Sequence, residues 1–301
     1  MHQTGTSPIA VFAYNRLDHL QETISALRQC TLADESELFI FCDGPREKDI
    51  AAVRAVRDYI KTIEGFKRMQ YRFSESNKGL ANSIIQGVTE ILETYDSIIV
   101  LEDDLVTSTN FLSFMNQAVR AFKKEQKVFS IAGYTMPIKL PDDYPYDNYF
   151  TGRASSWGWA TWKNRWEQVD WHVSDYRSFS KNPIEQRRFN RMGSDLSGML
   201  KSQMNGEISS WAIRWCYHQF KNDFYTVYPT VSKIVNIGFG EQATHTSSVN
   251  NRFATNLDVA EKHQFNFQLQ PMLMKPIIHQ FTAIYSLKTR IYYKIKAILG
   301  M

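Results

Sequence analysis

The 301-residue sequence has few cysteines and no recognisable targeting segment. Its three cysteines, Cys30, Cys42 and Cys216, are widely spaced and form no CxxC pair. This pattern excludes a disulfide framework and a cysteine zinc site, and it predicts a reduced, cytosolic location. The opening residues MHQTGTSPIAVFAYNR lack a basic region followed by an apolar stretch, so we expect no secretory signal.

Charge is spread unevenly along the chain. The net charge is +4, yet seven basic and two acidic residues lie from position 251 onward, which leaves the first 250 residues near neutral. The hydrophobic fraction of 43% is typical of a folded globular protein. A near-neutral body with a basic tail argues against nucleic-acid binding and predicts one local anionic partner.

The first half alternates between short apolar runs and segments with helical spacing. The expected strands are residues 8–13, 38–42, 69–73, 97–101 and 128–132, and the expected helices are residues 18–29, 47–64, 79–95 and 110–124. Alternating strands and helices predict right-handed βαβ units, and therefore an α/β fold with a mostly parallel sheet flanked by helices.

Polar residues follow each of the first four expected strands. They are Tyr14, Asn15 and Arg16; Asp43 and Gly44; Asn77, Lys78 and Gly79; and Glu102, Asp103 and Asp104. Turns favour such residues in any protein, which is the simpler interpretation. Because ligands bind outside the carboxyl ends of parallel strands, their joint presence at one edge favours a nucleotide site.

The segment SIIVLEDD ends a β-branched run in three carboxylates, Glu102 to Asp104. Such charges are costly to place beside a buried strand unless a cation meets them. Mg²⁺ and Mn²⁺ prefer carboxylate oxygens and bind diphosphates at their remaining positions. The alternative is a strand end followed by a solvated loop.

Tryptophans crowd the second half. Five of them lie between residues 157 and 171, and Trp211 and Trp215 follow. Most are expected in the core. Trp157 and Trp159 are kept as candidates for stacking on an acceptor sugar, since Gly158 between them leaves room for close approach.

Several motifs together resemble the GT-A glycosyltransferases. They are NxR after the first strand, DG after the second, ESNKGLANS, EDD, SSWGWATW and NIGFGEQATHT. The sequence is most similar to bacterial family 2-type sugar transferases and the N-acetylglucosaminyltransferase I group. The resemblance implies a GT-A domain over residues 1–250, with a nucleotide-sugar-binding half at 7–134, an acceptor-side half at 135–250 and a tail at 251–301.

The resemblance also implies roles for the polar strand ends. Tyr14, Asn15 and Arg16 would border the base and ribose, Asp43 would accept a hydrogen bond from the base, and Asn77, Lys78 and Gly79 would face the diphosphate at a helix start. Asp103 is assigned to the donor. Asp104, Glu102 and His245 would hold Mn²⁺ or Mg²⁺.

Inverting sugar transfer needs a base beside the acceptor hydroxyl. The N-acetylglucosaminyltransferase group has acidic residues near the corresponding tryptophan, but here Ala212 and Ile213 follow Trp211. Glu207 is our candidate, on the expectation that it shares a helix face with Trp211, and Asp195 is the reserve.

Residues 275–301 have five basic residues, no acidic ones, and apolar residues at helical spacing. Charges interrupt the segment too often for a spanning helix. It predicts an amphipathic helix on an anionic membrane surface, or alternatively a tail docked on the domain. The first interpretation places the protein on the inner face of the cell membrane, with a lipid-linked saccharide as acceptor.

The leading hypothesis is a metal-dependent, inverting glycosyltransferase that uses a UDP-sugar in surface polysaccharide synthesis. A sugar nucleotidylyltransferase is one alternative, although a Gly-rich basic loop is missing after the first strand. A non-catalytic nucleotide-sugar-binding or glycan-binding module is the other.

Overall fold

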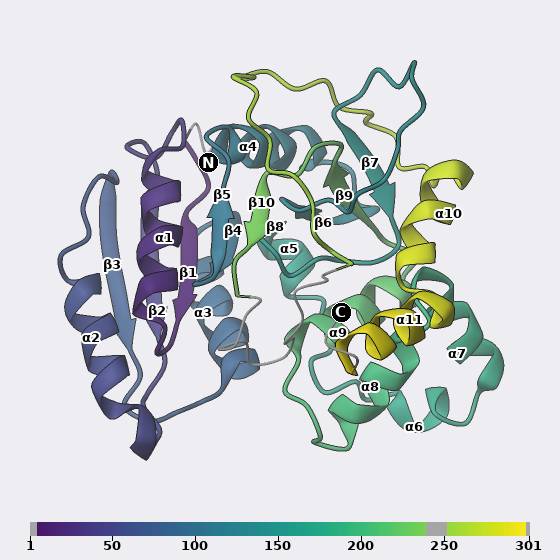
Figure 1. The fold of residues 1–301 in the computed structure, drawn as a ribbon, viewed down its shortest axis with the longest axis horizontal. Coiled ribbons are helices and arrows are strands. Elements are labelled where there is room, and N and C mark those ends of the chain that lie inside the picture. Colours follow the sequence, from purple (N-terminus) through teal and green to yellow (C-terminus); the bar gives the residue numbers. More distant parts are fainter. Residues whose placement is uncertain (1–4, 239–251, 299–301) are drawn as a thin grey trace.

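The parallel half of the sheet has the strands expected from the sequence. The computed structural model describes residues 5–238 and 252–298, and its main sheet has the order β3-β2-β1-β4-β8-β6-β9-β7 (Figure 1). The strands β1 (Ile9–Ala13), β2 (Glu37–Cys42), β3 (Arg68–Phe73) and β4 (Ser97–Glu102) pair in parallel. Their carboxyl ends therefore meet at one edge of the sheet.

The other half of the sheet is mixed. β8 (Trp159–Trp162) runs antiparallel to both β4 and β6 (Val128–Ala132), while β9 (Tyr225–Pro229) runs parallel to β6 and antiparallel to β7 (Asn148–Thr151). Of these strands only β6 was expected. All four residues of β7 and of β8 are buried, so neither strand shows the alternation that marks a half-exposed strand.

Helices cover both faces of the sheet. The core on one face includes α1 (Leu17–Arg28), α2 (Ile50–Ile60) and α4 (Phe111–Phe122), and the core on the other includes α3 (Leu80–Thr94) and α9 (Trp211–Lys221). In α1 the buried residues Leu20, Ile24 and Leu27 follow the spacing of one helix face. The structure thus confirms an α/β, Rossmann-like sheet between helical layers.

Short elements complete the described fold. They are the helices α5 (Lys163–Trp166), α6 (Tyr176–Phe179), α7 (Pro183–Phe189) and α8 (Leu196–Met204) and the 3₁₀ turns η1 (Glu47–Asp49) and η2 (Asn190–Met192). A second sheet pairs β5 (Leu105–Thr107) with β10 (Ile234–Asn236) in antiparallel fashion. This pairing returns a late segment to the turn that follows β4.

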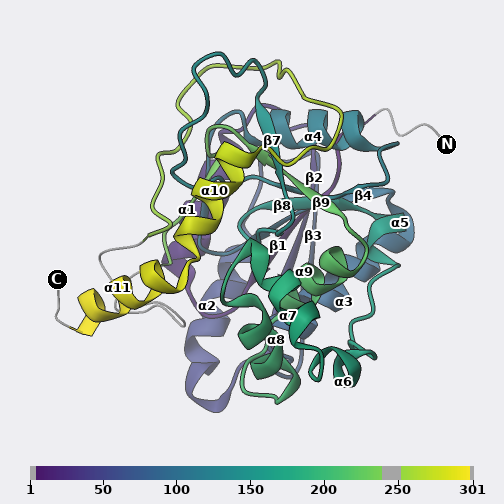
Figure 2. The same cartoon turned by 90° about the vertical axis from the view of Figure 1, so that its right-hand side faces the viewer.

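The tail forms two helices with different surroundings. α10 (Lys275–Ile284) buries Ile277 and Phe281 in the main core, whereas α11 (Leu287–Ile298) runs away from the body (Figure 2). For α10, the structure therefore agrees with the alternative prediction of a tail docked on the domain. None of the helices in the described ranges has the length and apolarity to cross a bilayer. The division at residue 250 stays a prediction, since α10 shares the main core.

Candidate active site

Two adjacent aspartates form an ion-pair cluster with Arg16 where β4 turns into β5. Glu102 ends β4, and Asp103 and Asp104 make the turn. Nη2 of Arg16 contacts Oδ1 of Asp103 and lies 2.9 Å from Oδ2 of Asp104. The backbone N–H of Tyr14 donates to Oδ2 of Asp103 over 3.3 Å. The loop after β1 and the acidic turn therefore form one site, in which Asp103 is held inward.

The acidic turn concentrates negative charge. Burial, followed by the neighbouring Asp104 and Asp103, raises the pKa of Glu102 well above its ordinary value. Burial also raises the pKa of Asp103 to about 6, against the opposing attraction of Arg16. The Arg16 guanidinium pairs with two of the three carboxyl groups, and further positive charge would stabilise the ionised forms of Glu102 and Asp103.

The segment after β10 closes over Asp104. The backbone N–H of Ile237 donates to the Asp104 carbonyl over 2.9 Å, and Nδ2 of Asn236 lies 3.3 Å from its Oδ1. A methyl group at Gly238 would overlap the Asp104 carboxylate and force that side chain to shift. Sequence reasoning missed Asn236 and Gly238, although a glycine two residues after Asn236 signals close backbone approach.

The oxygens around Asp104 suit a hard divalent cation. Mg²⁺ is commonly bound by one or two carboxylates together with substrate phosphates and water. Each Asp104 oxygen has one protein partner and keeps lone-pair capacity, and Glu102 is the neighbouring candidate. Over residues 5–238 and 252–298, no group of three or more His, Cys, Asp or Glu side chains could hold a metal. A cation at Asp104 would therefore need a diphosphate and water to supply most of its ligands. His245 lies outside the described residues.

Asp43 organises the loop that opens α3. Its Oδ1 accepts from the backbone N–H of Gly44 at 2.8 Å and of Lys78 at 2.9 Å, and its Oδ2 accepts from Gly79 N–H at 2.9 Å. Asp43 was expected to contact the base, and Lys78 and Gly79, just before α3, were expected to face the diphosphate. The structure instead pairs these groups with one another, because the buried carboxylate satisfies the free N–H groups at the helix start. Nζ of Lys78 donates to Gln86, 2.9 Å away along α3.

Side chains cross-link the loops after β1, β2 and β3. The Tyr14 hydroxyl donates to Asp49 over 2.8 Å and accepts from the Arg46 N–H over 3.0 Å. Asn15 donates to the same Asp49 over 3.0 Å, and Nε of Arg46 lies 3.4 Å from Oδ1 of Asn77. Sequence reasoning missed Arg46 and Asp49, which lie beyond the strand end. These contacts hold three of the predicted donor residues, Tyr14, Asn15 and Asn77, in one layer.

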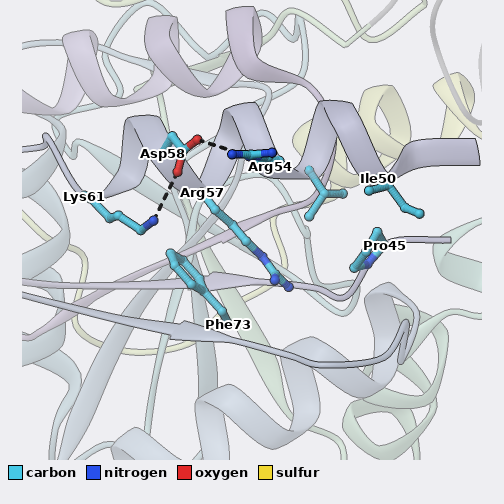
Figure 3. Close-up of a pocket in the computed structure, with 8 residues that line it drawn as sticks. Pro45, Ile50, Arg54, Arg57, Asp58, Lys61 and Phe73 are labelled. Atoms are coloured by element: carbon cyan, nitrogen blue, oxygen red, sulfur yellow. Dashed lines mark hydrogen bonds and ion pairs between the residues drawn. The ribbon is translucent and has the colours of Figure 1, made fainter. Parts of the chain in front are cut away.

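Arg57 stabilises the backbone next to this layer of residues. It lines a cavity of about 410 Å³ between α2 and the end of β3 (Figure 3). Its Nη2 donates to the carbonyls of Asp43 at 3.2 Å and Ser74 at 2.5 Å, and its guanidinium carbon lies 5.1 Å from the centre of the Phe73 ring. Arg57 therefore ties the ends of β2 and β3 together and fixes the backbone that carries Asp43.

Most of the tryptophans form an interior cluster. Trp159 is only 1% exposed, and its ring centroid lies 4.6 Å from that of Trp211 and 5.6 Å from that of Trp215. The expectation that Trp159 stacks on an acceptor sugar is therefore wrong, because core side chains cover the ring. Trp157 is half-buried against Tyr134, with ring centroids 4.6 Å apart, and its acceptor role stays a prediction.

Replacing Trp159 by alanine should destabilise the protein strongly. Removing a buried tryptophan side chain typically lowers the free energy of unfolding by about 3–5 kcal/mol. We expect a loss of that size in urea unfolding, and a much smaller one for Trp157→Ala. A stable Trp159→Ala protein with only a weakened acceptor KM would restore the sugar-stacking role.

The two candidate bases have different surroundings. Glu207 is exposed and lies in the loop before α9, whose N-cap is Ser210, so the expected shared helix face with Trp211 does not exist. Hydrogen bonds from Asn205, and then from Ser202, lower the pKa of Glu207. The carboxylate is therefore ionised at neutral pH, and the lowered pKa makes it a weaker base than an ordinary glutamate.

Asp195 has a structural setting instead. Arg153 donates two hydrogen bonds to it, at 2.8 and 2.9 Å, and both side chains are buried. Burial alone would raise the pKa of Asp195, but the hydrogen bonds and charge of Arg153 outweigh that effect and lower it. With both oxygens engaged in this pair, Asp195 is poorly placed to act as the reserve base.

The model of glycosyl transferase family 2 matches residues 9–182. Among solved structures, the chain is similar to the mannosyltransferase PcManGT from Pyrobaculum calidifontis in complex with GDP-Man and Mn²⁺, with 12% identity and a TM-score of 0.38 over 72% of this chain and 69% of that one.

It is also similar to TarS from S. aureus, with 12% identity and a TM-score of 0.35, over 55% of this chain and 30% of that one. No curated protein gives a significant match. The family model covers more than half of the sequence, from β1 to the residue before α7. The chain therefore belongs to glycosyl transferase family 2.

Proposed function

We propose that the protein transfers a sugar from a nucleotide-diphosphate sugar to a saccharide acceptor, with a divalent cation bound at Asp104. The observation that carries the proposal is the meeting of Arg16, Asp104 and the segment after β10 at the carboxyl edge of the parallel strands. This edge is where α/β sheets bind ligands. Family membership also favours transfer over nucleotidylyltransferase chemistry.

Some residues contact the donor in this proposal, and others hold those residues in place. Tyr14, Asn15 and Asn77 line the layer proposed for the nucleoside, and Asp49 and Arg57 hold that layer in place. Arg16 keeps Asp103 inward and orients Asp104. A cation bound at Asp104, with Glu102 as the neighbouring candidate, would neutralise charge on the departing diphosphate.

Glu207 is the base we propose for the acceptor hydroxyl. The loop of Glu207 lies beside the loop that carries Asn77 and Gly79. A methyl group built on Gly79 would lie 4.0 Å from the hydroxyl oxygen of Ser209, two residues after Glu207. Glu207→Gln should lower kcat by about 10²–10⁴-fold, the usual contribution of a positioned base, with little change in donor affinity. Asn205→Ala is the matched control, because it removes a hydrogen bond to Glu207 but keeps the carboxylate. Equal kcat in wild type and Glu207→Gln would show that another group accepts the proton.

The finer assignments rest on the sequence resemblance. They are an inverting stereochemical course, UDP as the nucleotide, and a lipid-linked saccharide acceptor in surface polysaccharide synthesis. A panel of UDP- and GDP-sugars incubated with Mn²⁺ tests them through nucleoside diphosphate release, and NMR of the product gives the anomeric configuration. Nucleotide binding without release, with every donor and acceptor, would favour the non-catalytic binding module instead.

A further inference from the structure

The terminal helix α11 carries a row of apolar side chains that are about half exposed. Leu287, Ile291 and Ile295 are 60%, 49% and 51% exposed, and Tyr292 beside them is 53% exposed. The three aliphatic residues are spaced by four, so they lie along one side of the helix. We call Leu287, Ile291 and Ile295 the α11 apolar row.

Basic residues border this row on both sides. At about 100° per residue, Lys288 and Lys294 lie at its two edges, and Arg290 and Lys296 lie farther round the helix. No acidic residue follows Glu261 in the sequence, so this charge has no acidic neighbour along the tail. An apolar stripe with cationic borders is the pattern of a helix that lies in a membrane interface, where lysine stems extend toward the headgroups.

Contacts at the start of α11 fix its position on the body. Tyr285, which precedes the helix, stacks on Arg153 with 3.7 Å between the guanidinium carbon and the ring centre. The Ser194 hydroxyl donates to the Tyr285 carbonyl over 2.7 Å and accepts from Nη1 of Arg290 over 3.2 Å. From this anchor α11 projects out of the body (Figure 2), which leaves the α11 apolar row available to a large flat partner.

We infer that α11 is a contact surface for an anionic lipid bilayer. The α11 apolar row would enter the headgroup and acyl boundary, while Lys288, Lys294 and their basic neighbours meet anionic headgroups. A second copy of the chain is a poorer occupant, because α11 against α11 would bring like charges together. This inference does not depend on the proposed transfer reaction, since none of the residues of α11 is assigned to donor binding or catalysis.

Sedimentation with vesicles tests the inference on the full chain. Wild type should bind vesicles of 30% phosphatidylserine in phosphatidylcholine and should bind pure phosphatidylcholine much more weakly. Lys288→Gln/Lys294→Gln should lower the partition coefficient about 30-fold, because each cation near the surface contributes on the order of 1 kcal/mol. Leu287→Ser/Ile291→Ser/Ile295→Ser should lower it by about 100-fold.

Ile184→Ser is the matched control, since Ile184 on α7 is 67% exposed and outside the tail, and its binding should equal that of wild type. Thermal unfolding shows whether each variant is folded. Failure of wild type to bind, or equal binding by a folded triple variant, would overturn the inference. A wild-type dimer that the triple substitution converts to monomer, without vesicle binding, would assign the α11 apolar row to a second copy and also overturn it.

Discussion

Asp104→Asn is expected to lower kcat/KM for sugar transfer by about 10³-fold, which corresponds to about 4 kcal/mol of transition-state stabilisation. Asp104 is the carboxylate of the acidic turn that keeps capacity for a cation, because Arg16 and Asn236 each engage only one of its oxygens. Asparagine keeps the size and the hydrogen bond to Asn236 but removes the charge. Nucleoside diphosphate release with saturating Mn²⁺ measures the effect.

Asp96→Asn is the matched control for this substitution. Asp96 directly precedes β4 at its other end, and its contact with Lys123, 3.2 Å away, is solvent-exposed. Such surface pairs contribute roughly 0–1 kcal/mol, so this variant should keep wild-type activity and stability. A loss of kcat/KM of tenfold or less in Asp104→Asn would contradict the cation site. An equal loss of kcat/KM in Asp104→Asn and Asp96→Asn would indicate a general effect on folding.

Arg153→Met is expected to lower the free energy of unfolding by about 3–5 kcal/mol, because it leaves the buried Asp195 carboxylate without its guanidinium partner. The substitution also removes the stacking of Arg153 on Tyr285, which anchors the end of α10. Urea unfolding measures the loss. Arg188→Met is the surface control, since Arg188 pairs with Glu185 at an exposed site and should cost less than about 1 kcal/mol.

Asp195→Asn separates a structural role from a catalytic one. If Asp195 only pairs with Arg153, this variant unfolds at a lower temperature yet keeps its kcat when assayed well below that temperature. The double variant Arg153→Met/Asp195→Leu should recover much of the lost stability, because apolar residues can replace a buried ion pair. A fall in kcat of about 10²-fold or more in folded Asp195→Asn would return Asp195 to the list of bases.

The sequence was informative about the parallel half of the fold for a physical reason. β1, β2 and β4 are apolar runs, and an amphipathic helix separates each of the four expected strands from the next, so the alternation predicts βαβ units. It was less informative about the mixed half. Strands such as β8 are short and buried on both faces, and their antiparallel partners are far apart in the chain. The break between α10 and α11 could not be predicted either, because both helices lie within one amphipathic pattern in the sequence.

The site could be predicted where its residues directly follow the ends of strands. It could not be predicted where the role of a residue depends on the group with which it pairs. The acidic turn and the residues after β1 followed from position alone. The pairing of Asp43 with the amides of Lys78 and Gly79 did not, because a carboxylate near a nucleotide site can bind either ligand or backbone. The approach of Gly238 to Asp104 depends on β10 pairing with β5, which links positions more than a hundred residues apart.

A crystal soaked with a nucleoside diphosphate and Mn²⁺ tests the central claim most directly. Anomalous scattering locates the manganese without reference to the protein density. The account predicts one manganese peak within coordination distance of the Asp104 carboxylate, with both phosphates bound to it and the nucleoside over the loops of Tyr14 and Asn77. A bound nucleotide whose manganese lies away from Asp104, or a nucleotide bound elsewhere on the sheet, would contradict it.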